Sequence, residues 1–125
     1  GFAVTGERGD LADDGPAGEE LVRAYYAALD GHEYDRLGSL LAPEFRQERP
    51  DMTLDGRAEF VEFMREKRPQ TSTSHPIAAV YRAGDGSLAA QGRLVGADGG
   101  VITGFVDVFT VVDGRIAAVE TYTDR

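Results

Sequence analysis

The stretch VITGFVDVFTVVDGRIAAVETYTD, residues 101–124, decides the fold of this chain. It predicts two long β-strands, because β-branched and aromatic residues fill both arms and Asp113-Gly114 between them favours a tight hairpin turn. Successive side chains alternate between the faces of a strand, so Phe105, Asp107 and Phe109 share one face. An acid in such an apolar run is costly unless water, a partner or a ligand meets its charge.

Turn residues divide the preceding region into two more strands. SHPIAAVYRA (74–83) ends at a Gly-Asp-Gly turn, and SLAAQGRLVG (87–96) is followed by Asp-Gly-Gly. Together with the hairpin of residues 101–124, these segments predict a four-stranded antiparallel meander.

The part of the chain before the meander has helical spacing. Apolar residues recur three and four positions apart in 17–30, about 34–41 and 57–68, which predicts three helices, with Pro43 ending the second. One short strand is expected between them, with Phe45, Gln47 and Arg49 on one face. Helices followed by a meander indicate an α+β domain whose helices cover one face of the sheet.

The length of 125 residues fits one domain. Residues 1–16 are rich in glycine and acids without periodicity, so they are expected to form a flexible arm, with a weak edge-strand signal at Phe2–Val4. The folded domain is then predicted to span residues 17–125.

The charge balance is strongly acidic. Twenty-two acids face 13 bases, giving a net charge of −9, which disfavours nucleic-acid binding. Lys67 is the only lysine, a composition that fits a GC-rich genome, a salt-adapted halophilic cytoplasm, or both. The lack of cysteine excludes disulfides, and no apolar run approaches the roughly 20 residues of a membrane span. No signal-peptide pattern is present, so a cytoplasmic location is expected.

Three stretches resemble the NTF2-like superfamily and its SnoaL-like family of polyketide cyclase and ketosteroid isomerase-like proteins. They are AYYAALDGHEYDRLGSLLAPEF (24–45), LDGRAEFVEFM (54–64) and VDVFTVVDGRIAAVETYTD (106–124). The resemblance runs from about Glu19 to Asp124. It implies a cone-shaped, cystatin-like fold in which three N-terminal helices pack on a curved, mostly antiparallel sheet around a ligand pocket. It does not define an activity, because one fold hosts many functions.

The resemblance gives Asp107 a role. In ketosteroid isomerases the acid of this strand is protonated and donates a hydrogen bond to a developing oxyanion, and in SnoaL-like cyclases it is the acid/base of ring closure. The tyrosine beside it in the isomerases aligns with Tyr25. The isomerase base, however, is replaced here by Arg49, and Arg93 stands where the cyclases often place a histidine. Limonene epoxide hydrolases need an Asp–Arg–Asp set, of which Asp107 and Arg49 supply only part.

The candidate site therefore comprises two catalytic candidates and five ligand-binding candidates. Arg49 either forms a buried ion pair with Asp107, holding it ionised, or anchors a carboxylate or enolate. His75 lies either at the cone mouth, where it could act in acid/base chemistry, or on the plain surface. The catalytic candidates are Asp107 and Arg49, and the ligand-binding candidates are Tyr25, Gln47, His75, Phe105 and Phe109.

The function predicted from these residues is binding of a hydrophobic, carbonyl-containing small molecule, with acid/base isomerase or cyclase chemistry at Asp107. The alternative is a non-catalytic ligand-binding or dimerisation module, including an accessory subunit that would be monomeric alone. No cofactor and no metal are predicted, because the two histidines lie far apart in sequence. A homodimer packed sheet to sheet is expected, since Ile102, Val106, Val108 and Val112 on the second face also need cover.

Overall fold

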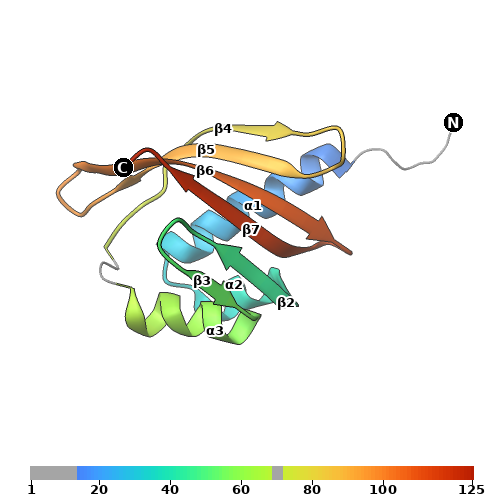
Figure 1. Ribbon diagram of the computed structural model, residues 1–125, viewed down its shortest axis with the longest axis horizontal. Coiled ribbons are helices and arrows are strands. Elements are labelled where there is room, and N and C mark those ends of the chain that lie inside the picture. The colour runs from blue at the N-terminus through green and yellow to red at the C-terminus, as the bar shows by residue number, and fades with distance from the viewer. Residues whose placement is uncertain (1–13, 69–71) are drawn as a thin grey trace, which may run out of the picture.

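The computed structural model describes residues 14–68 and 72–125 (Figure 1). In chain order the elements are α1 (Asp14–Asp30), α2 (Tyr34–Ser39), β2 (Leu41–Glu48), β3 (Thr53–Asp55), α3 (Arg57–Glu62), the π-helical segment η1 (Phe63–Lys67), β4 (Ile77–Arg82), β5 (Leu88–Val95), β6 (Val101–Val112) and β7 (Arg115–Thr123). The predicted α+β class is confirmed. Helix α1 begins at Asp14, so its first turn falls inside the predicted arm. The strand signal at Phe2–Val4 lies outside the described residues.

The six strands form one sheet in the order β3-β2-β7-β6-β5-β4. Strands β4 to β7 make the predicted antiparallel meander. Strand β2 joins the sheet in parallel with β7, and the short strand β3, which was not predicted, folds back on β2. Asp113 and Gly114 both have positive φ, at 53° and 77°, as a tight hairpin turn requires.

The expected end of the second helix was wrong. Helix α2 ends at Ser39, Leu41 already opens β2, and Pro43 lies within that strand. The pairing of β2 with β7 shifts register between Leu41 and Arg46. A proline is tolerated at such an irregularity because the ladder does not need its missing N–H there.

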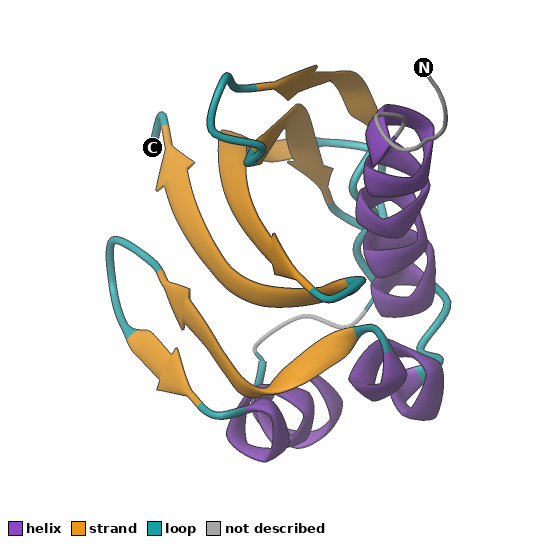
Figure 2. Cartoon of the chain, turned by 90° about the vertical axis from the view of Figure 1, so that its right-hand side faces the viewer, coloured by secondary structure: helices purple, strands orange, loops and turns teal. Residues whose placement is uncertain are grey.

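Helix α1 lies across one face of the curved sheet, and α2 and α3 close one end (Figures 1 and 2). The core fills the space between the helices and this face. Among the described residues, no helix covers the opposite face of β5, β6 and β7. The largest fully buried side chains are Tyr25, Phe45, Phe60, Phe109, Leu37, Leu41, Ile116, Val22 and Val119. No helix in 14–68 or 72–125 combines the length and apolarity needed to cross a membrane.

Gly92 lets the segment before β4 lie close to β5. A Cβ atom at this position would stand 2.5 Å from the carbonyl oxygen of Pro76 and 3.2 Å from the Phe105 ring. Since backbone cannot yield as a flexible side chain does, Gly92→Ala is expected to lower the free energy of unfolding by about 1–3 kcal/mol in urea titrations. Gly84→Ala, which meets no atom within 4 Å, is the matched control. Equal stabilities of the two variants would contradict the close approach.

Candidate functional site

The acid in the middle of β6 points to the helix-covered side of the sheet. Asp107 is only 5% exposed. The Tyr26 hydroxyl of α1 donates a hydrogen bond to Asp107 Oδ2 at 2.6 Å, and the Thr121 hydroxyl of β7 donates to Oδ1 at 2.5 Å. Both carboxyl oxygens are thus met by neutral hydroxyl groups.

Burial raises the pKa of Asp107 above its ordinary value, against the opposing effects of the Thr121 and Tyr26 hydrogen bonds and of charge on His75 and Arg49. Because the folded-state pKa is raised, the stability that Asp107 contributes is fully present below the unfolded pKa. It is lost as the pH rises through the folded value. Burial also raises the pKa of Tyr26, so its phenol remains a hydrogen-bond donor.

A cavity of about 590 Å³ lies beside this carboxyl group. Its volume lies in the range of pockets that hold drug-sized molecules, about 300–1,000 Å³. Asp51 and Arg125, which belong to its wall, have exposed side chains. Six of the seven predicted site residues line it. The described residues in its wall are Tyr25, Tyr26, Leu29, Gln47, Arg49, Pro50, Asp51, Met64, Arg68, Thr73, His75, Leu94, Ile102, Thr103, Phe105, Asp107, Thr121, Thr123 and Arg125.

Arg49 does not form the ion pair with Asp107 that was one of its two expected roles. Its guanidinium donates to both carboxylate oxygens of Asp51, at 3.1 and 3.2 Å, and lies over the Phe63 ring, 5.7 Å from the centroid. The turn after β2, closed by a 2.8 Å bond from the Arg49 N–H to the Met52 carbonyl, places Asp51 within reach. Arg49 therefore pairs with Asp51, its neighbour in the turn, and its side chain stays partly exposed in the cavity wall.

The tyrosine that contacts Asp107 is Tyr26, where the alignment had indicated Tyr25. Adjacent residues on a helix point about 100° apart, so only one of the two reaches the carboxyl group. Tyr25 packs against Phe60 and Phe109, with ring centroids 6.2 and 5.4 Å away. Phe109, which was expected to contact a ligand, is fully buried behind the two tyrosines and is not among the residues that line the cavity.

Gln47 extends the hydrogen-bonded chain that begins at Asp107. Its Nε2 donates to the Thr121 hydroxyl oxygen at 3.0 Å, while its Oε1 is buried without a hydrogen-bond partner among the described residues. A buried acceptor without a hydrogen-bond partner costs free energy, so this amide oxygen lowers the stability of the fold.

A second polar pair, which sequence reasoning missed, flanks the same cavity. His75 Nδ1 lies 2.6 Å from Asp30 Oδ1, and the His75 backbone N–H donates to Asp30 Oδ2 at 2.8 Å. The imidazole packs against the rings of Tyr26 and Phe105, with centroids 5.5 and 5.7 Å away. His75 was expected as a ligand-binding residue, but nothing in the sequence indicated that Asp30 is its partner.

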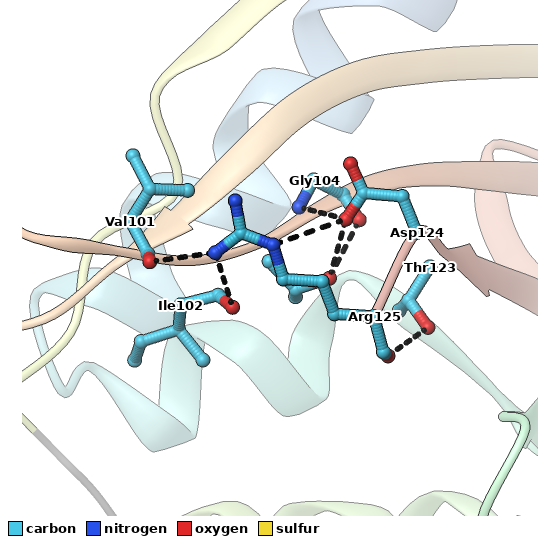
Figure 3. A network of polar contacts seen from close by, with 7 residues as sticks. Val101, Ile102, Gly104, Thr123, Asp124 and Arg125 are labelled. Carbon is cyan, nitrogen blue, oxygen red and sulfur yellow. Dashed lines mark hydrogen bonds and ion pairs between the residues drawn. The ribbon is translucent and has the colours of Figure 1, made fainter.

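The two residues that follow β7 are hydrogen-bonded to the first half of β6 (Figure 3). Asp124 accepts hydrogen bonds from the Gly104 N–H at 2.9 Å and the Thr103 hydroxyl at 3.0 Å. Arg125 donates to the carbonyl oxygens of Val101 and Ile102 at 3.2 and 3.3 Å. The bond from Gly104 lowers the pKa of Asp124, which therefore contrasts with the buried Asp107.

A curved sheet wrapped around helices, with a cavity between them, defines an NTF2-like protein of the cystatin-like fold. The family model of the SnoaL-like domain matches residues 22–119, and the chain belongs to that family. The chain is similar to a Kribbella flavida protein provisionally named a ketosteroid isomerase, with a TM-score of 0.78, 25% identity, and 90% of this chain and 81% of that chain covered. It is also similar to a protein from Jannaschia sp. CCS1, provisionally named a SnoaL-like polyketide cyclase, with a TM-score of 0.76, 19% identity, and coverages of 93% and 91%.

A third solved structure, an NTF2-like protein of unknown function from Mesorhizobium loti, has a TM-score of 0.75 and 24% identity over 93% of this chain and 98% of that chain. No curated protein matches this sequence. These comparisons fix the fold and the family, and they leave the activity to be argued from the site.

Proposed function

We propose that this protein binds a hydrophobic, carbonyl-containing small molecule in the cavity and performs acid/base isomerisation or ring closure on it, with Asp107 as the proton donor or acceptor. The observation that carries the proposal is the setting of Asp107. A buried structural carboxylate is normally paired with a cation, whereas the two oxygens of Asp107 bond, within the part of the chain that the structure describes, only to the hydroxyls of Tyr26 and Thr121. An acid held in this way has a raised pKa and is suited to proton transfer.

The proposed chemistry takes place at the carbonyl oxygen of the ligand. Protonated Asp107, which accepts the hydrogen bond of the Tyr26 hydroxyl, donates its own proton in a hydrogen bond to this oxygen as negative charge develops on it. Arg49, held by Asp51 in the cavity wall, serves as a polar anchor for a carboxylate or enolate portion of the ligand. The names of the Kribbella and Jannaschia proteins are in line with a carbonyl ligand.

Exchange of the α-protons of a ketone tests the proposal directly. The probe is 2-tetralone in D₂O, whose loss of α-proton signal is followed by NMR with and without protein. Binding is followed in parallel through amide shifts of cavity residues. Acceleration of exchange over buffer supports acid/base chemistry. Binding without acceleration favours the non-catalytic ligand-binding module, and neither binding nor acceleration contradicts the proposal.

A homodimer formed through the uncovered sheet face is part of the same proposal. Among the described residues, large exposed apolar side chains include Val106 and Tyr122, which lie opposite each other on β6 and β7, with Tyr81, Val101 and Val112. Ile102 was expected on this face, but it lines the cavity. Exposed apolar patches on sheets commonly mark subunit contacts. Light scattering is expected to give twice the 13.5 kDa of one chain.

A charge on this face is expected to break the dimer, because a lysine buried in an apolar interface loses its hydration. Val106→Lys should therefore give a monomer in light scattering, and Ala58→Lys, which adds the same charge on the exposed surface of α3, should remain dimeric. A wild-type monomer would support the accessory-subunit alternative.

A further inference from the structure

The pair formed by Asp30 and His75 has the arrangement of an oriented base. A carboxylate only accepts hydrogen bonds, so the 2.6 Å contact places the imidazole proton on Nδ1. In the neutral ring the lone pair then lies on Nε2. The 2.8 Å bond from the His75 backbone N–H to the second oxygen of Asp30 fixes the carboxylate as well, so the tautomer and the ring orientation are both set.

The second ring nitrogen of His75, Nε2, belongs to a side chain that lines the cavity. Among the described residues Nε2 has no hydrogen-bond partner, and it is not one of the fully buried unpartnered atoms, which are Gln47 Oε1 and Arg68 Nε. The side chain is 14% exposed, and His75 lines the cavity. The solvent that reaches this nitrogen can therefore be replaced by a ligand.

His75 and Asp107 are linked through the same tyrosine. The Tyr26 hydroxyl bonds to Asp107 while its ring packs 5.5 Å from the imidazole, centroid to centroid. The ring of Phe105, which lies two residues before Asp107 on β6, also packs against the imidazole. The cavity wall thus contains a buried acid and an oriented base, which are the two groups that enolisation of a bound carbonyl compound requires.

Building on the proposed function, we propose that His75 is the base that removes the α-proton of the carbonyl ligand, and that Asp30 is its positioning residue. The α-carbon–hydrogen bond breaks, and the proton moves to His75 Nε2. The electron pair of the broken carbon–hydrogen bond forms the carbon–carbon double bond of the enol, while the carbonyl oxygen accepts the hydrogen bond or the proton of Asp107. Transfer of the proton from His75 to a different carbon gives isomerisation. Transfer of a deuteron from D₂O to the original α-carbon gives exchange.

Substitution of His75 is the first test, again with 2-tetralone in D₂O. His75→Gln is expected to lower the exchange rate by about 10²–10⁴-fold, because the amide has no basic nitrogen. The dissociation constant of the ketone should change little. His32→Asn, at the other histidine, is the matched control, since asparagine tolerates the positive φ of 58° at this position.

Substitution of Asp30 tests positioning. Asp30→Asn offers an N–H to Nδ1 and so favours the opposite tautomer, which is expected to lower exchange by roughly 10²-fold or more. Nitrogen-15 NMR of His75 gives a readout that a merely structural role would not move: Nδ1 carries the proton in the wild type and Nε2 carries it in Asp30→Asn.

Carbethoxylation of the wild-type protein by diethyl pyrocarbonate, mapped by mass spectrometry, tests the role of His75 without a substitution that could disturb folding. Exchange activity should fall in step with modification of His75, and 2-tetralone should slow that modification. If exchange depends on Asp107 but survives loss of His75, the base assignment fails and the proposed function stands. If the wild type accelerates no exchange, the base assignment and the proposed function both fail. A neutral His75 that carries its proton on Nε2 in the wild type would by itself contradict the proposed pairing with Asp30.

Discussion

Replacing Asp107 with asparagine is expected to lower the rate of α-proton exchange in bound 2-tetralone by about 10²–10⁴-fold, the usual contribution of a positioned acid or base. Asparagine keeps the size of the side chain and one acceptor for the Tyr26 or Thr121 hydroxyl, so the fold and the dissociation constant of the ketone should change little. The rate is measured by NMR at saturating ketone, and binding by amide shifts.

The matched control is Asp98→Asn, in the exposed turn between β5 and β6. Both substitutions remove one carboxyl group from the same chain, but only one of them removes the carboxyl group enclosed at the cavity. An exchange rate that is equal in the wild type and in Asp107→Asn would remove Asp107 from the chemistry, even if the ketone still binds.

Replacing Phe109 with alanine is expected to lower the free energy of unfolding by about 3–5 kcal/mol, a large part of the stability of a domain this size. Phe109 is 0% exposed, and its ring lies edge-on to Tyr25 and Tyr26 at centroid distances of 5.4 and 5.9 Å. The alanine would leave a cavity behind both tyrosines. Urea unfolding monitored by circular dichroism measures the loss.

The milder variant Phe109→Leu separates packing from binding. Since Phe109 does not line the cavity, this variant is expected to lose stability while it retains the affinity for 2-tetralone within a few-fold. Phe105→Leu, on the same strand and in the cavity wall, is the comparison and should weaken binding. A large loss of affinity in Phe109→Leu with unchanged stability would return Phe109 to the ligand site.

The sequence predicted those parts of the fold that depend on local periodicity. Alternation along residues 101–112 placed Asp107 on the inward face, and the turn residues marked the meander. The parallel pairing of β2 with β7, in which Gln47 lies opposite Val119, joins segments about 70 residues apart and has no local signal. Pro43 led to a wrong prediction of the end of α2, because an irregularity in the register allows β2 to contain this proline.

The partners of Asp107 show why the site was harder to predict. Counting back from the two-residue turn at Asp113-Gly114 would set Asp107 opposite Glu120. A shift in register between Thr110 and Val111 moves the pairing by one residue, so that Thr121 lies opposite Asp107. Such a bulge cannot be read from the alternation of side chains. The choice of Tyr26 likewise depends on the rotation of α1, which only its packing fixes.

The pairing of His75 with Asp30 has the same origin. His75 lies just before β4 and Asp30 ends α1, 45 positions away, so their contact is a product of how the helix meets the sheet. The close approach of Pro76 to Gly92 helps to set the path of this segment. A sequence without structure offers a histidine and an aspartate but no reason to join them.

The most direct test of the account is the titration of the Asp107 carboxyl carbon by ¹³C NMR, assigned by its disappearance in Asp107→Asn. Burial between α1 and β6 is expected to place the pKa of Asp107 above the ordinary aspartate value of about 3.9. A value at or below the ordinary one would mean that the hydrogen bonds and nearby cations hold this group ionised, and Asp107 could not then be the acid of the proposed reaction.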